Sequence, residues 1–261
     1  MNSRQHAATG AARRQAMAEH VMRQGSSSVT ELAETFSVSV MTVHRDLDEL
    51  ERQGMVRKFR GGATAQASSV FESNIVYRLT AHQEEKEAIA RYVAGLVEPG
   101  NSIMLDDSTT ALAVARHLGD VTPLTVVTNF LEAIKLLTGV PGIRLIALGG
   151  EYHPTHDSFL GVACVDAVEA MNTDLVIVST SAVSDRYAFH QEQEIVLVKR
   201  AMLQSGTRRI LAIDHSKLGR VALHRVAPLD VFDTIVVDSL APGEAIDRLR
   251  ERHLNVEIAE I

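Results

Sequence analysis

The sequence predicts an α/β protein in two parts: a small N-terminal domain of three helices and a two-stranded hairpin, then a larger, mainly parallel α/β domain. Two observations predict this division. Helical patterns and a glycine-ended hairpin pattern fill the first 64 residues, whereas apolar runs of strand length alternate with helical patterns beyond residue 78. Apolar strands separated by helices are typical of a parallel sheet that is buried on both faces.

The composition of the 261 residues indicates a soluble protein with no membrane partner. Hydrophobic residues make up 46% of the chain, and no apolar run reaches the roughly eighteen residues of a membrane span. The first fifteen residues hold three arginines and no apolar core of a secretory signal, so we expect a cytoplasmic protein with a disordered start over 1–12. The single cysteine, Cys164, excludes an internal disulfide and is expected to be a buried structural thiol.

The net charge of −7 is distributed unevenly. Residues 1–64 hold nine Lys and Arg against seven Asp and Glu, a balance of +2, and the remainder holds 17 against 26, a balance of −9. Any contact with a polyanion therefore belongs to the N-terminal part. Two excess charges alone do not predict nucleic-acid binding.

The first two helices are marked by their ends. Residues 12–24 have a helical pattern, which Gly25 and three serines end. Ser28-Val29-Thr30-Glu31 then has the form of a capping box, which predicts a short helix through Phe36.

The third helix is expected in the stretch SVSVMTVHRDLDELERQG, at positions 37 to 54, with Ser39 as its N-cap and Gly54 at its end. At about 100° per residue, its apolar and polar positions fall on opposite faces. The inner face holds Val43, Leu47 and Leu50, and the outer face holds Met41, Arg45 and Arg52, flanked by Thr42 and His44.

A small wing and the larger domain follow. In residues 55–63, MVRKFRGGA, apolar and polar residues alternate imperfectly and a glycine pair stands near the end. This pattern predicts a two-stranded wing, and with the three helices it predicts a winged helix-turn-helix over 13–64. We expect a polar linker over 65–77 and the α/β domain over 78–261. Its expected strands are Ser102–Leu105, Leu124–Thr128, Arg144–Leu148, Leu175–Ser179, Ile210–Ile213 and Ile235–Val237, and its helical patterns are 84–97, 109–118, 130–138 and 191–204.

Two sets of motifs resemble one known family. The run VTELAETFSVSVMTVHRDLDELERQGMVRKFRGGA closely resembles the winged helix of DeoR-type bacterial transcriptional regulators, whose signature is F-x-V-S-x-x-T-[IV]-R-R-D-L-x-x-L-E with a downstream H-G-G-A. The segments IMLDDSTTALAVARHL, LTVVTN, IALGG, FLG, VKRAM and DHSKLG resemble, in order and spacing, that family's sensor domain, which is similar to ribose-5-phosphate isomerase. Three positions depart from the family pattern, namely His44 and Arg60 in the first set and Ser108, in place of glycine, in the second.

The resemblance implies contact with DNA. In a winged helix-turn-helix the second helix of the pair enters the major groove by its N-terminal end. We expect base contacts from Met41, Thr42, His44 and Arg45, and phosphate or minor-groove contacts from Ser28, Thr30, Ser39, Arg57, Lys58 and Arg60. The alternatives are a surface salt bridge from Arg45 to Asp48 or Glu49 and, for the three wing residues, a solvated basic hairpin.

A ligand site is expected where strand 102–105 meets the next helix. A helix start offers unpaired amides and a positive dipole end, and open α/β sheets bind ligands at the carboxyl ends of strands. The resemblance implies a phosphorylated sugar or related metabolite, bound by candidates at Asp106, Asp107, Ser108, Thr109, Thr110, Asn129, His190, Glu194, Lys199 and Lys217. The two lysines are expected to neutralise the phosphate, and Asp106 and Asn129 to hold sugar hydroxyls. The alternative for each lysine is a surface side chain.

The histidines leave three possibilities open. His153 and His156, with His190 and Glu194, could form a zinc or manganese site, a polar effector pocket, or neither. An isomerase would need a general base, for which Glu192 or Glu194 could serve, but we favour binding without turnover.

The sequence thus predicts a DNA-binding transcriptional regulator, a repressor of a carbohydrate-utilisation operon, with no enzymatic activity, no cofactor and no metal. Its expected partners are double-stranded operator DNA and a phosphorylated sugar, and a homodimer or homotetramer is expected because operators are read by two-fold symmetric proteins. The alternatives are a sugar-phosphate isomerase-like enzyme with a DNA-binding appendage and a module that senses a metal.

Overall fold

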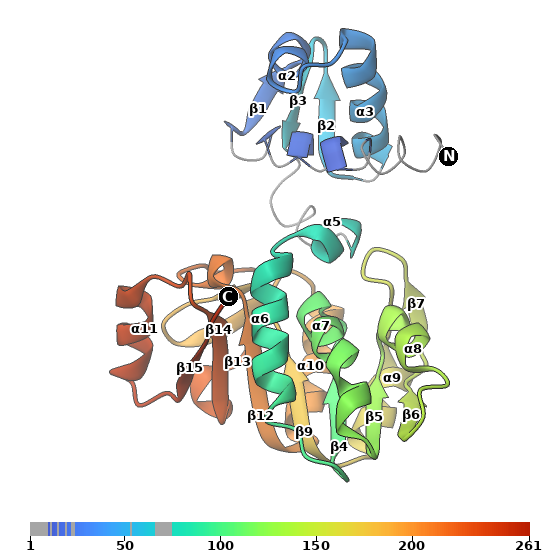
Figure 1. Ribbon diagram of the computed structural model, residues 1–261, viewed down its shortest axis with the longest axis vertical. Helices are drawn as coiled ribbons and strands as arrows, with labels where there is room; N and C mark the ends of the chain where they lie inside the picture. Colours follow the sequence, from blue (N-terminus) through green and yellow to red (C-terminus); the bar gives the residue numbers. More distant parts are fainter. Residues whose placement is uncertain are drawn as a thin grey trace. The chain divides into compact units, whose positions relative to one another are not determined.

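The computed structural model describes residues 10, 12–14, 16–18, 20–21, 24–52, 54–65 and 75–261. The chain separates into two compact units, Met1–Arg78 and Leu79–Ile261 (Figure 1). The disordered start expected over 1–12 and the linker expected over 65–77 lie largely outside the described residues. At the edges of the second range, a strand reaches Ala65 and helix α5 occupies Ile75–Thr80.

The N-terminal unit has the expected helices. Residues 12–14, 16–18, 20 and 21 are helical, and α2 (Val29–Thr35) and α3 (Val40–Arg52) follow. The capping box is confirmed, because the Glu31 amide donates to the Ser28 hydroxyl and the Ser28 amide donates to the Glu31 carboxylate. The helices enclose a core of buried apolar side chains, which includes Met17, Val21, Leu32, Val43, Leu47, Leu50 and Met55.

The expected two-stranded wing is confirmed, and a third strand that was not expected pairs with it. The strands β1 (Ser26–Ser28), β3 (Gly62–Ala65) and β2 (Val56–Phe59) lie in that order and pair antiparallel. The serines that were expected only to end a helix therefore form an edge strand. Their side chains show no apolar alternation, so only backbone pairing with β3 reveals the strand.

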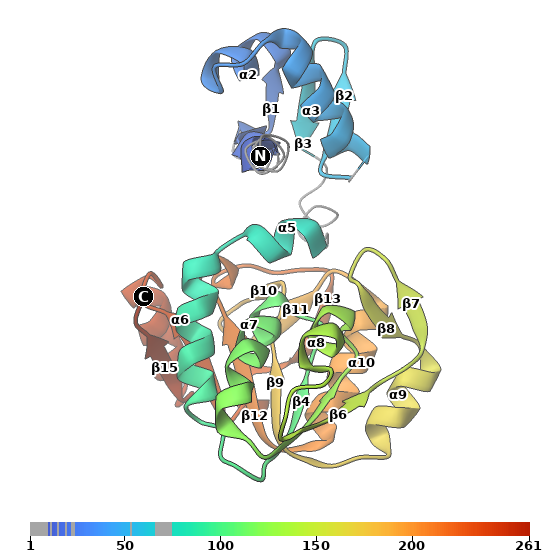
Figure 2. The same cartoon turned by 45° about the vertical axis from the view of Figure 1, so that its right-hand side comes forward.

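The C-terminal unit is built on a seven-stranded sheet in which every neighbouring pair is parallel. Its strands, in spatial order, are β15 (Val256–Ala259), β14 (Thr234–Asp238), β12 (Gly206–Ile213), β9 (Thr173–Val178), β4 (Ser102–Leu105), β5 (Leu124–Thr128) and β6 (Ile143–Ala147). One face is covered by α6 (Gln83–Ala94), α7 (Thr109–His117) and α8 (Leu131–Leu137), and the other by α9 (Val162–Glu169) and α10 (Gln193–Gln204) (Figures 1 and 2).

The expected parallel α/β domain and its six strands and four helices are confirmed, with shifts of a few residues at some ends. Several smaller elements were not expected. They are the hairpin β7 (Glu151–His153) and β8 (Ser158–Leu160), the antiparallel strands β10 (Ala182–Val183), β11 (Tyr187–His190) and β13 (His224–Pro228), the helices α9 and α11 (Gly243–Arg250), and the edge strand β15. Among the described residues, no helix combines the length and the apolar composition needed to cross a bilayer.

Candidate functional site

Helix α3 presents a polar, exposed start. Ser39 caps it as expected, since the Thr42 amide donates to the Ser39 hydroxyl oxygen at 3.2 Å and the two hydroxyls lie 2.9 Å apart. Met41 is 72% exposed and Arg45 is exposed, whereas Val43 on the opposite face is fully buried. The first turns of α3 therefore face solvent while their apolar side packs on the core.

An ion pair between a buried aspartate and a half-buried arginine fixes the orientation of α3. Asp46 is 2% exposed and accepts from Arg13 of the first helix, with 2.7 Å between Oδ2 and Nε and 3.2 Å between Oδ1 and Nη2. The hydrogen bond to Asp46 raises the pKa of Arg13 against the lowering effect of its burial. Because a bidentate Arg–carboxylate pair fixes both direction and distance, this contact sets which residues of α3 point outward.

The salt bridge considered for Arg45 is absent from the described part of the chain, where its two possible partners pair with other residues. Asp48 forms an ion pair with Lys58, and Glu49 forms one with Arg52. Arg45 therefore extends from the exposed face of α3, with no acidic partner among the residues that the structure describes.

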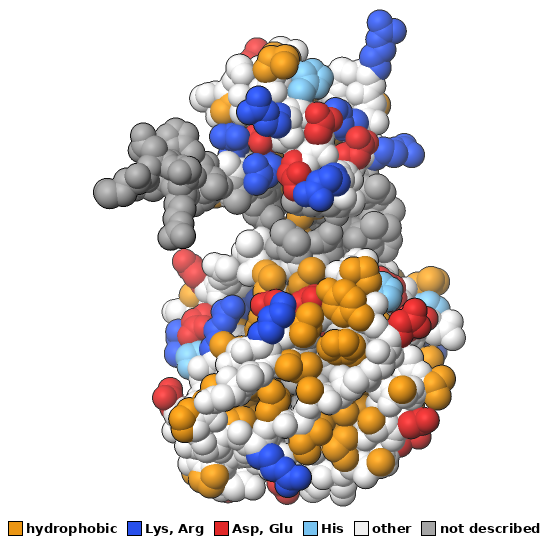
Figure 3. Space-filling model, turned by 90° about the vertical axis from the view of Figure 1, so that its right-hand side faces the viewer, with side chains coloured by type: hydrophobic (Ala, Val, Ile, Leu, Met, Phe, Trp, Pro, Cys, Tyr) orange, Lys and Arg blue, Asp and Glu red, His pale blue; other side chains and the backbone are white. Residues whose placement is uncertain are grey.

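The expected phosphate-binding residues differ in how available they are. Thr30, Arg57 and Arg60 are exposed, but Lys58 is bound to Asp48 and the Ser28 hydroxyl caps α2. Basic and acidic side chains alternate over the N-terminal unit on the face shown in Figure 3. On this face the described residues present separate cationic side chains and no continuous basic stripe, in line with the small charge excess.

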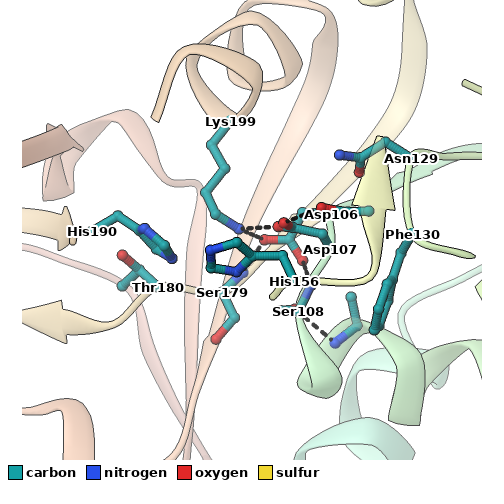
Figure 4. A network of polar contacts seen from close by, with 12 residues as sticks. Asp106, Asp107, Ser108, Asn129, Phe130, His156, Ser179, Thr180, His190 and Lys199 are labelled. Carbon is teal, nitrogen blue, oxygen red and sulfur yellow. Dashed lines mark hydrogen bonds and ion pairs between the residues drawn. The ribbon is translucent and has the colours of Figure 1, made fainter. Parts of the chain in front are cut away.

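Several of the expected effector-binding residues, together with two residues that were not expected, lie at the carboxyl edge of the large sheet. Asp106 and Asp107 follow β4, Asn129 follows β5, and Ser179 and Thr180 follow β9 (Figure 4). All of these side chains are buried. The topology therefore brings together residues that are up to 74 positions apart, between Asp106 and Thr180.

A network of buried charges occupies the centre of this edge. Lys199 points from α10 towards the two aspartates and forms ion pairs with Asp106 and, at 3.2 Å, with Asp107 (Figure 4). Asp106 also accepts from the amides of Ser108 at 3.0 Å and Ser179 at 2.8 Å, and Asp107 accepts from the Ser158 hydroxyl at 3.0 Å. Each of the four carboxylate oxygens thus has a donor within the protein.

This network changes the roles expected for its members. Lys199 is 2% exposed, so the surface alternative is wrong for this lysine. Burial acts to lower the pKa of Lys199, but the charges of Asp106 and Asp107 outweigh it and raise that pKa. Two carboxylates already neutralise the charge of Lys199, which does not fit its expected role of neutralising a phosphate. Asp106 is already bonded to donors of the protein, which does not fit its expected role of holding a sugar hydroxyl.

Asn129 and the start of α7, both beside the network, have groups that could form further hydrogen bonds. Asn129 donates through Nδ2 to the Phe159 carbonyl oxygen at 3.0 Å, but its buried Oδ1 has no partner among the described residues. Ser108 caps α7 by accepting from the Ala111 amide at 3.0 Å, and Thr109 and Thr110 form the first turn of that helix. Both groups lie at adjacent strand ends, since β4 pairs with β5.

Lys217 lies further along the same edge. It belongs to a short 3-10 helix, His215–Lys217, which follows β12, two strands from β4. Burial acts to raise the pKa of the neighbouring Asp214, but the positive charges of Lys217 and His82 outweigh it and lower that pKa. Lys217 is half-buried, so a cationic group remains accessible at this edge.

The histidines converge, but with a different glutamate from the one expected. Glu194 is exposed, whereas Glu192 lies 2.8 Å from His156, measured between Oε2 and Nε2. The ring centroids of His156 lie 5.2 Å from those of His153 and 6.0 Å from those of His190. Glu192 precedes α10 on an extended backbone, whereas Glu194 lies in the first turn of the helix.

Sequence reasoning missed Ser158, Ser179 and Thr180 as members of this edge. Ser179 was available as a signal, because it ends an expected strand and such ends carry ligand sites in α/β sheets. Ser158 lies on the hairpin β7–β8, which was not expected, so nothing pointed to it.

The chain is similar to known proteins over both units. The model of the DeoR-like helix-turn-helix domain matches residues 13–69, and that of the DeoR C terminal sensor domain matches residues 81–239. The chain is 34% identical over 248 residues to the uncharacterized HTH-type transcriptional regulator YgbI of Escherichia coli (strain K12), covering 95% of this chain and 97% of that protein. It is 33% identical to the glycerol-3-phosphate regulon repressor of the same strain, with 92% and 95% covered, and 32% identical to the HTH-type transcriptional repressor GlcR of Bacillus subtilis (strain 168), with 83% of each covered.

Solved structures are more distant. Ribose 5-phosphate isomerase A from Methanocaldococcus jannaschii matches with a TM-score of 0.39 at 18% identity, covering 53% of this chain and 55% of that chain. The translation initiation factor eIF-2B from Pyrococcus horikoshii OT3 matches with a TM-score of 0.47 at 12% identity, covering 87% and 86%. These scores carry no argument about function. The two family models and the relatives do, and they show that the chain belongs to the DeoR family of DNA-binding transcriptional regulators.

Proposed function

We propose that this chain is a transcriptional repressor in which α3 reads operator DNA and the C-terminal unit binds a phosphorylated sugar or a related metabolite. The exposed start of α3 is the observation that supports DNA reading by this helix. Met41 and Arg45 project from a helix whose other face is held by a buried core and by the Arg13–Asp46 pair. A helix fixed in this way can enter a major groove about 12 Å wide without rearranging its own domain.

The base contacts follow from side-chain chemistry. The Arg45 guanidinium can donate two hydrogen bonds to guanine O6 and N7, and Met41 can pack on a thymine methyl group. Arg57 and Arg60 on the wing, and Thr30 on α2, are exposed and suited to phosphates. Lys58 contributes less, because binding a phosphate would break its ion pair with Asp48.

The effector proposal rests on the carboxyl edge of the sheet. The start of α7 supplies amides and the hydroxyls of Thr109 and Thr110, which suit a phosphate, and Lys217 can add a positive charge. The Oδ1 of Asn129, which has no hydrogen-bond partner among the described residues, can accept from a sugar hydroxyl. The names of two relatives support this class of effector, since one represses a glycerol-3-phosphate regulon and another is the repressor GlcR.

Binding without turnover fits the contacts better than catalysis. A general base needs a carboxylate that is free to take a proton. Asp106 and Asp107 are saturated by internal donors, and the expected alternative Glu194 is exposed on α10. The other expected base, Glu192, lies 2.8 Å from His156 in an ion pair. We therefore propose that the ligand regulates and is not converted.

Regulation requires two states with unequal affinity for the effector. We propose a homodimer or homotetramer, because a two-fold symmetric operator presents two half-sites. An effector that binds one arrangement of the two winged helices more tightly than the other then changes operator affinity.

Two measurements test the proposal. A thermal-shift screen of phosphorylated sugars against the full chain should yield a stabilising compound, and a mobility-shift assay on DNA selected from random duplexes should show sequence preference. The hit should change DNA affinity, whereas its dephosphorylated form should not. If no duplex is preferred, the DNA half is wrong; if a hit is converted to another sugar phosphate, binding without turnover is wrong.

A further inference from the structure

We infer that His153, His156 and Glu192 form a binding site for a divalent transition-metal ion of the zinc class. One donor atom from each side chain lies within 4.8 Å of the other two. The site borders the proposed effector contacts, because Ser158 of the same hairpin donates to Asp107 and Phe159 accepts from Asn129 (Figure 4). The inference does not rest on the proposed function.

The hairpin β7–β8 holds the two histidines in place. His153 ends β7, and its carbonyl oxygen accepts from the amides of His156 at 3.2 Å and Asp157 at 2.9 Å, which closes a tight turn. The Tyr152 hydroxyl donates to Asp157 at 2.7 Å, and Ser158 at the start of β8 donates to Asp107. The turn is thus fixed at both ends before any ion binds.

The third donor comes from a different element. Glu192 lies at the start of α10, and its side chain is 34% exposed, so the site opens to solvent on this side. His156 is fully buried beneath it. An ion could therefore enter past the carboxylate and bind the histidines behind it.

The chemistry of the donors selects the ion. Two imidazoles and one carboxylate are ligands of zinc and related transition metals, whereas calcium and magnesium prefer oxygen alone. Around a tetrahedral ion, with bonds of about 2.0–2.2 Å, the donors would lie roughly 3.3–3.6 Å apart. Glu192 Oε2 and His156 Nε2, now 2.8 Å apart, would open to this value as the ion separates them, and the other donor pairs lie within 4.8 Å. A fourth position stays open for water or another oxygen ligand.

One orphaned atom distinguishes this group from an ordinary cluster of polar residues. The Nδ1 of His153 is buried and has no hydrogen-bond partner among the described residues. A buried polar atom without a partner costs about 1–3 kcal/mol, and an ion bound to it would remove that cost.

A second group of possible ligands, His82, Glu85 and His215, serves as an internal comparison. There His215 Nδ1 already pairs with Asp238 at 2.9 Å, and His82 Nδ1 lies 3.4 Å from Glu85. Within the described part of the chain, neither histidine has a buried nitrogen without a hydrogen-bond partner, so we assign no ion to this group.

The test uses the full chain, without a histidine tag and stripped of metal by a chelator. Titration with Zn²⁺ should show one saturable site per chain, and Co²⁺ should give the visible absorption of a four- or five-coordinate ion. His153→Asn and Glu192→Gln should each weaken Zn²⁺ binding at least about tenfold, while the exposed-site control His253→Asn should leave it unchanged.

The variants also separate a lost ligand from a lost fold. Glu192 is partly exposed, so E192Q should keep the wild-type thermal unfolding temperature without metal and lose only the rise that Zn²⁺ produces. The inference is overturned if the wild-type chain shows no saturable Zn²⁺ site, or if H153N and E192Q bind as tightly as the wild type. It is equally overturned if His82→Asn, and not H153N, abolishes binding.

Discussion

Lys199 and Asp106 form an ion pair in which both side chains are almost completely buried, although they lie 93 positions apart in the sequence. A charge pair of this kind fixes the distance between α10 and the end of β4. Asp107 completes the network from the other side of the ammonium group. The carboxyl edge of the sheet is therefore built around a fixed polar centre.

Replacing Lys199 with methionine should destabilise the C-terminal unit by about 3–5 kcal/mol, because it leaves two carboxylates buried without a cation. Chemical denaturation at pH 7 measures the loss. The control is Lys135→Met, whose pair with Glu132 is exposed to solvent and should contribute little to stability.

The stabilisation from Lys199 also has a defined pH range. Since the pKa of Lys199 is raised in the folded protein, its contribution is fully present below the ordinary lysine pKa and is lost as the pH rises through the folded value. A K199M protein as stable as the wild type at neutral pH would contradict the central role of this pair.

Replacing Arg45 with alanine should remove operator preference and leave weak general DNA affinity. A bidentate contact to guanine contributes about 1–3 kcal/mol of discrimination, or roughly 5- to 150-fold. Mobility-shift assays with the selected duplex and a scrambled duplex measure it. Arg52→Ala on the same helix is the matched control, because Arg52 is paired with Glu49. Unchanged discrimination in R45A would show that α3 does not read bases through this residue.

Much of the fold could be predicted from the sequence because its signals are local. The capping box at Ser28 and the apolar sector of α3 each need only a few neighbouring residues, and both are confirmed. The strand β1 could not be predicted, because three serines form it only through pairing with a strand 36 residues further on. Strands of this kind depend on contacts that no sequence window contains.

The candidate site likewise has features that could be predicted from the sequence and features that could not. The hydroxyl turn after β4 follows from strand-end rules, and the structure places it as expected at the start of α7. The saturation of Asp106 could not be predicted, because its donors come from Ser179 and Lys199, which are distant in sequence. The choice of Glu192 over Glu194 likewise depends on where α10 begins.

Replacing Asn129 with alanine should weaken binding of the sugar-phosphate hit at least about tenfold, since the partnerless Oδ1 is removed. The loss of its bond to Phe159 should cost only about 1 kcal/mol of stability. Calorimetric titration measures the affinity. Asn101→Ala is the control, because it also removes one hydrogen bond, to the Glu98 amide, but at the opposite end of β4. Equal affinities of N129A and N101A would place the effector elsewhere.

Replacing Gly62 with alanine should destabilise the winged helix by about 1–3 kcal/mol through overpacking. A Cβ at this position would lie 2.5 Å from the Ser27 carbonyl oxygen and 2.6 Å from the Phe59 ring, so the strands β1 and β3 could not keep their pairing. DNA affinity should fall while the C-terminal unit still unfolds at its wild-type temperature in calorimetry. Gly149→Ala, where a Cβ meets no atom within 4 Å, should change neither property.

Cys164 should resist alkylation in the folded protein. It is fully buried on α9, and burial raises the pKa of its thiol to about 11. At pH 8 only about one thiol in a thousand is then a thiolate, and the thiolate is the reactive form. Mass spectrometry after iodoacetamide treatment should show an unmodified native chain and complete labelling in denaturant.

The raised pKa of Cys164 also means that the folded state binds the thiol proton more tightly than the unfolded state does. The free energy of unfolding should therefore fall as the pH rises from about 9 to about 11. Cys164→Ala should lose this part of the pH dependence. In the labelling experiment, rapid modification of the native wild type at pH 8 would show that α9 opens far more often than its burial implies.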